Sequence, residues 1–494
     1  MPAKITIEEM ATFAKSRGFI YPNSEIYGGY TGFFDFGPLG VELKNNIKNQ
    51  WRKRFVQQQN NVLGIDGAII THPQVWKASG HVDSFEDILV ECNKCKGRFR
   101  GDHLVELALN ITANGISTKD IDTMIKENDI KCPTCGAIEW GHANEFNLMF
   151  TTNVGPRVTD TSKTYLRPET AQLIFINFKQ IVDTCRVKLP FGIAQIGKAF
   201  RNEISPRDFL FRCREFEQME LEFFVHPDKK ECPHIQSILK FEFNLLSAKD
   251  QEENKEHKKI SIHDMIKNNL LEPWHAYWLK EVYQWFLELG ISRENLRLRQ
   301  HKKDELAHYS KACFDIEYNF PFGWKEIHGS ANRGCFDLTQ HSQESGKSLE
   351  FFDEETKQKI IPHVIEPSQG VERAFLAFLF ESYEDDKERG NIVLHLNPRL
   401  VPIQLGIFPL VNKLDEKAQE LYDRLRKIFV CTYDKSGSIG RRYARADERG
   451  IPYCITFDFE SLEDGCVTVR DRDTTIQERI KIDKLEDYFY KTFR

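Results

Sequence analysis

The stretch GIAQIGKAFRNEISPRDFLFRCREFEQMELEFF, Gly192 to Phe224, decides how this chain can fold. It consists of two extended runs, Gly192–Glu203 and Arg212–Phe224, separated by a polar segment that contains Pro206. A proline among polar residues interrupts regular structure. In the second run apolar and polar side chains alternate, as they do along a strand with one face toward a core. The stretch therefore predicts a hairpin whose loop is longer than a tight turn.

The hairpin carries an unusual amount of charge for a strand pair. Arginine and glutamate are rarely buried without a partner or a ligand. One explanation is a solvated face with cross-strand ion pairs, which contribute little to stability. The alternative is a phosphate site, because Arg201 and Arg214 fall on facing strands with Phe216 close by. Guanidinium groups bind phosphate through paired hydrogen bonds, and an aromatic ring can stack on a purine.

FRNE followed by RxREFEQME resembles motif 2 of the class II aminoacyl-tRNA synthetases, in the form found in dimeric glycyl-tRNA synthetases. The matching string is long and therefore highly specific. The resemblance implies an α+β fold, an antiparallel sheet flanked by helices, with a small zinc-knuckle insertion and a C-terminal mixed α/β anticodon-binding domain. It also implies ATP-dependent ligation of glycine to tRNA(Gly) in two steps through a glycyl-adenylate.

Two more blocks fit this family. A helix is predicted from Pro38, with an apolar stripe at i+4 spacing: Leu39, Leu43, Ile47, Trp51 and Phe55. The stripe is explained by packing on the chain's own core, but the resemblance favours motif 1, the dimer interface. Val364 to Tyr383 predicts a β-run ending in Pro367, then Gly370, then an apolar helix. Gly370 lets the helix N-terminus approach a phosphate. The block resembles motif 3, whose arginine, Arg373 here, contacts the γ-phosphate.

The pairs Cys92/Cys95 and Cys132/Cys135 predict a metal site. Each CxxC turns two thiolates toward one point, and the second pair begins 37 residues after Cys95. Two such pairs complete a closed tetrahedral site for structural zinc. Free thiols or a redox CxxC are the alternatives, but the sequence around them lacks a βαβ pattern. The other cysteines are mostly scattered singly, which is typical of reduced thiols in the cytosol.

The resemblance implies the site residues one by one. Those for ATP are Arg201, Asn202, Glu203, Phe211, Arg212, Cys213, Arg214, Glu215, Phe216, Glu326, Ile327, Gly370, Val371, Glu372 and Arg373. Those for glycine are Arg100, Glu169, Phe216, Glu217, Gln218, Met219, Glu220, Arg333, Glu366, Pro367, Ser368, Gln369 and Gly370. Arg201, Arg373 and Glu326 are the catalytic candidates: Arg201 for the α-phosphate, Arg373 for the γ-phosphate, and Glu326, with Glu215 as a second candidate, for Mg²⁺.

Glutamates 169, 220 and 366 are expected to surround the ammonium of glycine. Three carboxylates at one point repel each other, so one of them should have a raised pKa in the empty pocket. Two of the assignments have simple structural alternatives. Arg100 could be a surface residue beside the zinc, and Glu169 could complement the dipole of a helix. Neither His72 nor His81 is expected to be catalytic.

Length and composition limit the remaining possibilities. A chain of 494 residues is too long to fold around one hydrophobic core, so several domains are expected. We expect the first part of the catalytic domain, with motif 1, at 1–90 and the zinc-binding insertion at 91–138. The catalytic domain should then continue, with motifs 2 and 3, at 139–396, where about 226–304 is less similar to the family. The anticodon-binding domain is expected at 397–494. The last of these contains Arg441, Arg442, Arg445 and Arg449, then Arg470 and Arg472, which suggest either a solvated helix or an RNA surface.

The net charge of −6 gives no overall indication of nucleic-acid binding. A tRNA partner would therefore have to bind to a local basic surface. Neither a signal core nor an apolar run long enough for a membrane span is expected, and the predicted location is the cytoplasm. Two rival functions remain. One is another class IIa synthetase, for threonine, proline or histidine. The other is a non-catalytic synthetase-like nucleic-acid-binding subunit, a class that lacks the motif arginines present here.

Overall fold

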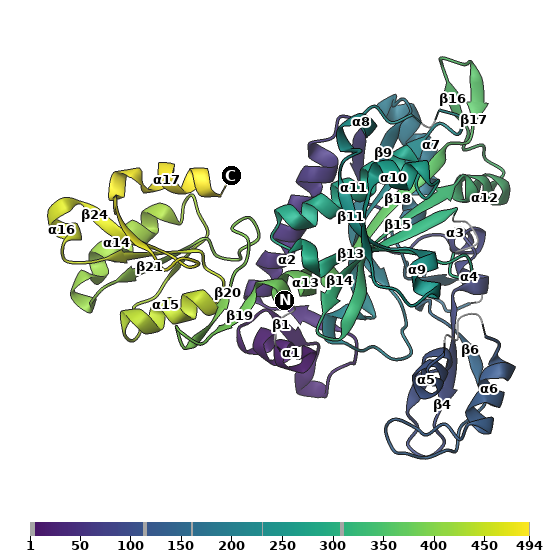
Figure 1. Ribbon diagram of the computed structural model, residues 1–494, viewed down its shortest axis with the longest axis horizontal. Helices are drawn as coiled ribbons and strands as arrows, with labels where there is room; N and C mark the ends of the chain where they lie inside the picture. Colours follow the sequence, from purple (N-terminus) through teal and green to yellow (C-terminus); the bar gives the residue numbers. More distant parts are fainter. Residues whose placement is uncertain (1–4, 112–115, 160–161, 230, 307–310, 494) are drawn as a thin grey trace.

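A single large sheet organises the central part of the molecule. The computed structural model describes residues 5–111, 116–159, 162–229, 231–306 and 311–493 (Figure 1). The nine strands run in the order β12-β11-β13-β14-β15-β18-β10-β9-β3, and all neighbours are antiparallel except β11 with β13 and β3 with β9. Their bounds are β12 Lys258–Ser261, β11 Glu242–Leu246, β13 Leu296–Gln300, β14 Ala312–Phe320, β15 Gly323–Gly334, β18 His363–Gly370, β10 Glu215–Val225, β9 Phe191–Phe200 and β3 Val62–Ile65. The predicted α+β fold class is confirmed.

The predicted hairpin is present as β9 and β10. The two strands pair without a break from Phe200↔Glu215 to Phe191↔Phe224. Met219, Leu221 and Phe223 are fully buried on one face of β10. The segment between the strands contains the short 3₁₀ turn η4, Phe209–Phe211, so the loop is long, as its composition indicated. The polar positions of the alternation, Gln218, Glu220 and Glu222, are buried as well, so from Gln218 onward both faces of β10 are covered.

Helices cover both faces of the sheet. The face with the larger core carries α2 Pro38–Arg52, α11 Pro273–Glu288 and α13 Val371–Ser382. The five apolar residues predicted for the stripe of α2 and its continuation are all buried. The other face carries α7 Ala171–Cys185 and α12 Phe336–Ser345 over a smaller core. Residues 226–304, where sequence signals were few, supply α11 and three strands at one edge of this sheet.

The motif 3 strand extends further than expected. The sequence suggested that it would stop at Pro367, because proline cannot donate a hydrogen bond to a ladder. Strand β18 instead continues to Gly370 and pairs with β15 at Ser330↔Pro367. On the β10 side, pairing is present at Glu220↔Ser368 and Phe223↔Ile365 and absent between them. The proline is thus accommodated by a local interruption of the β10–β18 ladder.

A second sheet forms the C-terminal part of the chain, in yellow-green to yellow in Figure 1. Its order is β22-β21-β23-β24-β25, with β21 parallel to β22 and β23 and the last two strands antiparallel. The strands are β21 Leu405–Pro409, β22 Cys431–Tyr433, β23 Tyr453–Phe457, β24 Cys466–Asp471 and β25 Gln477–Lys481; the longer helices are α14 Asp415–Leu425, α15 Ile439–Glu448 and α17 Leu485–Thr492. The mixed α/β module predicted here is confirmed.

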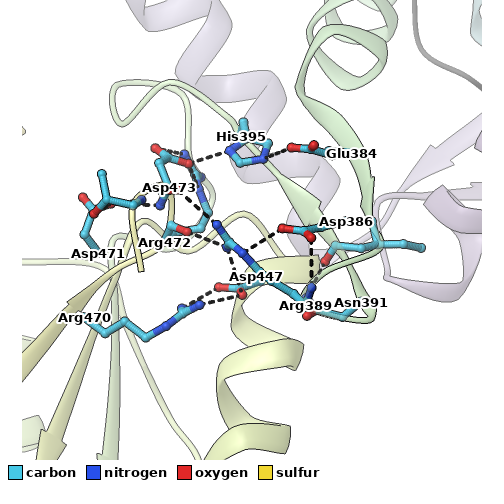
Figure 2. A network of polar contacts seen from close by, with 12 residues as sticks. Glu384, Asp386, Arg389, Asn391, His395, Asp447, Arg470, Asp471, Arg472 and Asp473 are labelled. Carbon is cyan, nitrogen blue, oxygen red and sulfur yellow. Dashed lines mark hydrogen bonds and ion pairs between the residues drawn. The ribbon is translucent and has the colours of Figure 1, made fainter. Parts of the chain in front are cut away.

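A polar network joins this second sheet to the hairpin β19 Tyr383–Asp386 and β20 Asn391–Leu394, which follows α13 (Figure 2). The Arg389 guanidinium donates to the carbonyl oxygens of Arg472 and Asp473 at 2.7 and 3.0 Å. His395 bridges Asp473 and Glu384 at 2.7 and 2.8 Å. The hydrogen bond that His395 donates to the Asp473 carboxylate raises the pKa of His395 despite its partial burial.

The same network corrects part of the expected basic RNA surface. Arg442, Arg470 and Arg472 are each more than nine-tenths buried. Arg470 forms a bidentate ion pair with the buried Asp447, and Arg472 donates to the carbonyl oxygens of Gly450 and Leu396. Arg442 donates to the carbonyl oxygens of Pro409 and Gly437. Because buried guanidinium groups with such partners are held in place by the fold, the three side chains are structural. The exposed Arg441 remains a candidate for RNA contact.

A smaller module projects from the central sheet at the lower right of Figure 1. It has a three-stranded sheet, in the order β5-β4-β6, and two helices. The bounds are β4 Glu86–Glu91, β5 Arg98–Arg100, α5 Gly101–Leu109, α6 Thr118–Glu127 and β6 Asn144–Asn147. In the described ranges of the whole chain, no helix has the length and apolar content needed to cross a bilayer.

Candidate active site

A cavity of about 300 Å³ opens on the sheet face that carries α7. Its floor comes from β10, β15 and β18, one wall comes from the β9–β10 loop, and one end from the start of α13. Sixteen predicted site residues line it: Glu169, Arg201, Glu203, Phe211, Arg212, Cys213, Phe216, Gln218, Glu220, Glu326, Glu366, Ser368, Gln369, Gly370, Glu372 and Arg373. Motifs far apart in the sequence therefore meet in one cavity.

Arginines occupy this cavity together with aromatic rings. The Arg201 guanidinium lies 5.3 Å from the centroid of the Phe216 ring, and its Nε donates to the Pro168 carbonyl at 3.0 Å. The Arg373 guanidinium lies 4.4 Å from the Phe211 ring and pairs with a Glu326 carboxylate oxygen at 2.9 Å. Guanidinium groups held in this way can bind the phosphates of a nucleotide.

Carboxylates gather in another part of the cavity. Glu169 lies just before α7, which begins at Ala171 and thus slightly later than the sequence suggested. Glu220 and Glu366 come from the neighbouring strands β10 and β18. The Glu220 carboxylate accepts a hydrogen bond from Thr170, and the Glu366 carboxylate accepts one from Arg333 at 2.9 Å. An ammonium group is the ligand that such an arrangement would bind.

Each of these carboxyls has a shifted pKa. Burial raises the pKa of Glu366 to about 8, with Arg333 opposing the shift and Glu220 adding to it. Burial, and then the charge of Glu169, raise the pKa of Glu220. Burial also acts on Glu169, but His81 and then Arg333 outweigh it and lower the pKa of this group. The expected raised pKa in the empty pocket is therefore found in Glu366 and Glu220.

The other predicted site residues lie outside the lining. Ile327, Met219 and Val371 are fully buried in the core beneath the sheet. Glu217 pairs with Lys44 at 2.7 Å, and Glu215, the second candidate for Mg²⁺, pairs with Lys198. The remaining five are Asn202 and Arg214 near the β9–β10 loop, Pro367 in β18, Arg333 behind Glu366, and Arg100 in the small module, where it pairs with Asp102 and Asp87.

Sequence reasoning missed an acidic wall of the cavity. Asp315 on β14 lies opposite Gly329 on β15, and both line the cavity. A side chain on Gly329 would begin 3.7 Å from a Glu326 oxygen and 3.9 Å from an Asp315 oxygen. Burial, and then the Glu326 charge, raise the pKa of Asp315 to about 6 although His301 contacts it at 2.7 Å. The sequence signal that could have revealed Asp315 was an aspartate at a buried position of the strand CFDIEYNF.

The four cysteines predicted to bind metal come together in the small module. The Cys92–Cys135 and Cys95–Cys132 sulfur pairs are separated by 3.7 and 3.6 Å, and all four sulfurs lie within 4.8 Å of one another. A tetrahedron with Zn–S bonds of about 2.3 Å places its sulfurs about 3.8 Å apart. None of the four forms a disulfide. The cluster is thus compatible with zinc.

Known proteins resemble the chain along its whole length. The profile of the family described as "tRNA synthetase class II core domain (G, H, P, S and T)" matches residues 150–241, and that of "Anticodon binding domain" matches residues 404–492. A protein of Caldanaerobacter subterraneus named "Glycine–tRNA ligase" is 47% identical over 99% of this chain and 98% of its own. A protein with the same name from Acetivibrio thermocellus is 47% identical over 100% of both chains. Another, from Geobacillus thermodenitrificans, is 46% identical over 98% of this chain and 97% of its own.

Proposed function

The chain belongs to the glycine–tRNA ligase family, with a class II synthetase core and an anticodon-binding domain, and on that premise we propose how its residues carry out the ligation of glycine to tRNA. The observation that supports the proposal is the division of one cavity into a part with arginines and aromatic rings and a part with carboxylates. The first suits a nucleotide triphosphate and the second an amino acid that offers only its ammonium and carboxylate groups.

In the first step a carboxylate oxygen of glycine attacks the α-phosphorus of ATP, forming glycyl-adenylate and releasing pyrophosphate. Arg201 neutralises charge at the α-phosphate, Arg373 does so at the γ-phosphate, and Phe216 stacks on adenine. In the second step a hydroxyl of the terminal tRNA ribose attacks the activated carbonyl and AMP leaves. Positioning and charge stabilisation account for such chemistry without a general acid or base of the protein.

Mg²⁺ fits the acidic wall of the cavity. Carboxylate oxygens are its preferred protein ligands, and those of Glu326 and Asp315 flank the space above Gly329. We assign these two residues to Mg²⁺, with Arg373 released from Glu326 to bind phosphate. The bound ion would draw negative charge from the phosphate oxygens. For the small module we propose one structural zinc, held by its four cysteines.

Because glycine has no side chain, the pocket can recognise it only by its ammonium and carboxylate groups and by excluding larger amino acids. Glu169, Glu220 and Glu366 bind the ammonium and fix its position against the sheet. A pocket can reject one additional methylene by only about 1–3 kcal/mol through fit alone, but a rigid wall adds steric overlap. The wall here is a sheet strand, β18, with Ser368 and Gln369 lining the cavity.

Pyrophosphate exchange with ATP tests this function. We expect the purified chain to catalyse exchange with glycine and to give no more than background with threonine, proline or histidine, the substrates of the nearest alternatives. Exchange with one of those three instead would assign the chain to a different specificity. No exchange with any amino acid, in a chain that still binds tRNA, would support the non-catalytic alternative.

We also propose that the chain forms a homodimer. The segment before α2 exposes large apolar side chains, with Ile26 88%, Tyr27 87% and Tyr30 72% accessible. Exposed apolar side chains in one segment commonly mark an interface, and the resemblance of α2 to motif 1 supports an interface on this part of the molecule. Sedimentation velocity should give twice the chain mass at micromolar concentration. A monomer at that concentration would reject the proposal.

A further inference from the structure

Glu222 is a fully buried acid directly behind the proposed glycine pocket. It lies on β10 two residues beyond Glu220, is 0% exposed, and is not among the residues that line the cavity. Neither of its carboxyl oxygens has a hydrogen-bond partner within the described part of the chain. The register of β10 with β18 places it opposite Glu366, where Pro367 interrupts the ladder. A buried polar group without a partner calls for a functional explanation.

The groups that face Glu222 are mostly acidic. Oxygens of Glu220, Glu222 and Glu366 all lie within 4.8 Å of one another, and the charges acting on Glu222 also include Asp337 of α12. Arg333 of β15 is the cation among them, and it is already engaged by Glu366 at 2.9 Å and by Asp337 at 2.8 Å. Glu169 and, through it, His81 approach Glu366 and Glu220 from the cavity side. Ionising every carboxyl would leave several negative charges against one guanidinium.

A neutral carboxyl resolves this imbalance. Burial, followed by the charge of Glu366, raises the pKa of Glu222 well above its usual range. In the neutral form its hydroxyl is a donor, and carboxyl oxygens of Glu366 and Glu220 lie within 4.8 Å, so a small side-chain shift would bring an acceptor to hydrogen-bond distance. A hydrogen bond from a neutral donor to a carboxylate favours the ionised form of the acceptor. Glu222 can thus promote ionisation of the acids that meet glycine without adding charge.

We propose that Glu222 is a positioning residue of the glycine pocket, a neutral carboxylic acid that donates its proton in a hydrogen bond to Glu366 while Glu366 binds the ammonium of glycine. The inference rests on the proposed function, because it assumes that Glu366 contacts glycine. No proton is transferred to the substrate. When glycine binds, Glu366 loses its own proton to solvent, and the hydrogen bond from Glu222 stabilises the carboxylate that results.

Two variants of the full-length chain distinguish whether Glu222 acts as a hydrogen-bond donor or as a negative charge. Glu222→Gln keeps the shape and a neutral donor, whereas Glu222→Leu keeps the bulk and removes the donor. In glycine-dependent exchange we expect Glu222→Leu to raise the KM for glycine about 10- to 100-fold, the range for one hydrogen bond to a charged group. The KM for ATP should stay unchanged, and Glu222→Gln should remain within about threefold of the unmodified chain.

The control is His328→Leu. His328 is also buried without a hydrogen-bond partner in the described residues, and it lies on β15 outside the cavity lining. A general cost of replacing a buried polar group would appear in this variant as well, as a lower thermal midpoint. The KM for glycine should stay unchanged in His328→Leu.

The pH profile gives a readout that packing alone would not move. Because the pKa of Glu366 is raised to about 8, its neutral form prevails below that pH in the empty pocket. The KM for glycine should therefore fall as the pH rises from about 6.5 to about 8.5. Without the donor, ionisation of Glu366 becomes harder, so Glu222→Leu should shift this fall to higher pH, and Glu222→Gln should not.

Infrared difference spectra of the glycine-bound chain test the protonation directly. In the difference between the unmodified chain and Glu222→Gln, both bound to glycine, the carbonyl band of one neutral carboxylic acid should be present. The proposal is overturned if that band is absent, or if Glu222→Gln loses glycine affinity as strongly as Glu222→Leu, which would indicate a carboxylate that holds a cation. If Glu222→Leu does not fold, the glutamine variant and its spectrum still decide the question. Failure of the proposed function is distinguishable, because the unmodified chain would then show no exchange with glycine.

Discussion

Arg201→Ala should slow the formation of glycyl-adenylate by about 10²- to 10³-fold, the usual loss when one preorganised donor to a developing charge is removed. The side chain is held in place by its hydrogen bond to the Pro168 carbonyl and by the rings of Phe216 and Phe85. It can therefore stabilise charge at the α-phosphate without reorganising. The loss should appear mainly in kcat for pyrophosphate exchange, with a smaller change in the KM for ATP.

Arg207→Ala is the matched control for this prediction. Arg207 belongs to the same β9–β10 loop, and its side chain is 45% exposed and outside the cavity lining. Its exchange rate should stay within about twofold of the unmodified chain. Arg201→Lys should recover little activity, because a lysine ammonium lacks the planar fork of a guanidinium. Exchange by Arg201→Ala at the unmodified rate would show that Arg201 does not contact the reacting phosphate.

Removal of zinc should unfold the small module while the central sheet stays folded. The module has a modest apolar core of its own, built around Val90, Leu104, Val105, Ile121 and Ile125. Binding of structural zinc to such sites is worth about 10–16 kcal/mol at neutral pH, more than a core of this size supplies. In Cys132→Ser, or after chelation, limited proteolysis should cut within the module at sites that are protected when zinc is bound.

Metal analysis and a control complete this test. We expect one zinc per chain in the unmodified protein and much less than one in Cys132→Ser. Cys185→Ser, which changes an exposed cysteine at the end of α7, should leave both zinc content and proteolysis unaltered. An unmodified protein that contains no zinc, resists chelators and keeps the module protected would show that the four thiols need no metal.

The motifs could be predicted from sequence because each is a local pattern. The alternation in Arg212–Phe224, the stripe from Leu39 to Phe55 and the two CxxC pairs are set by period and spacing alone. The structure places β10, α2 and the four cysteines accordingly. The predicted end of this strand at Pro367 was wrong. A local rule against proline in strands takes no account of which neighbouring strand can do without the missing hydrogen bond.

Other residues were out of reach of such patterns. Asp315 joins the cavity because β14 pairs with β15, and His301 joins it because β13 pairs with β14. Nothing in their local sequence identifies those partner strands. Arg442, Arg470 and Arg472 looked like a basic surface, yet all three are buried. Arg470 pairs with Asp447 of α15 beside the β19–β20 hairpin (Figure 2), and Arg442 donates to the carbonyl oxygens of Pro409 and Gly437. Charge along a sequence does not indicate whether the fold leaves it in water.

The amino-acid sequence was sufficient to determine the chain's family and its chemistry, and it predicted the residue types for a triphosphate, an ammonium and a zinc ion, because these depend on side-chain identity and short spacing. Tertiary structure alone decided which carboxyls share a pocket, how Arg333 is divided between them, and that Glu222 lies behind Glu366 without a partner. The reason is that ionisation depends on burial and on charges a few ångströms away, and strand pairing brings those charges together from distant parts of the chain.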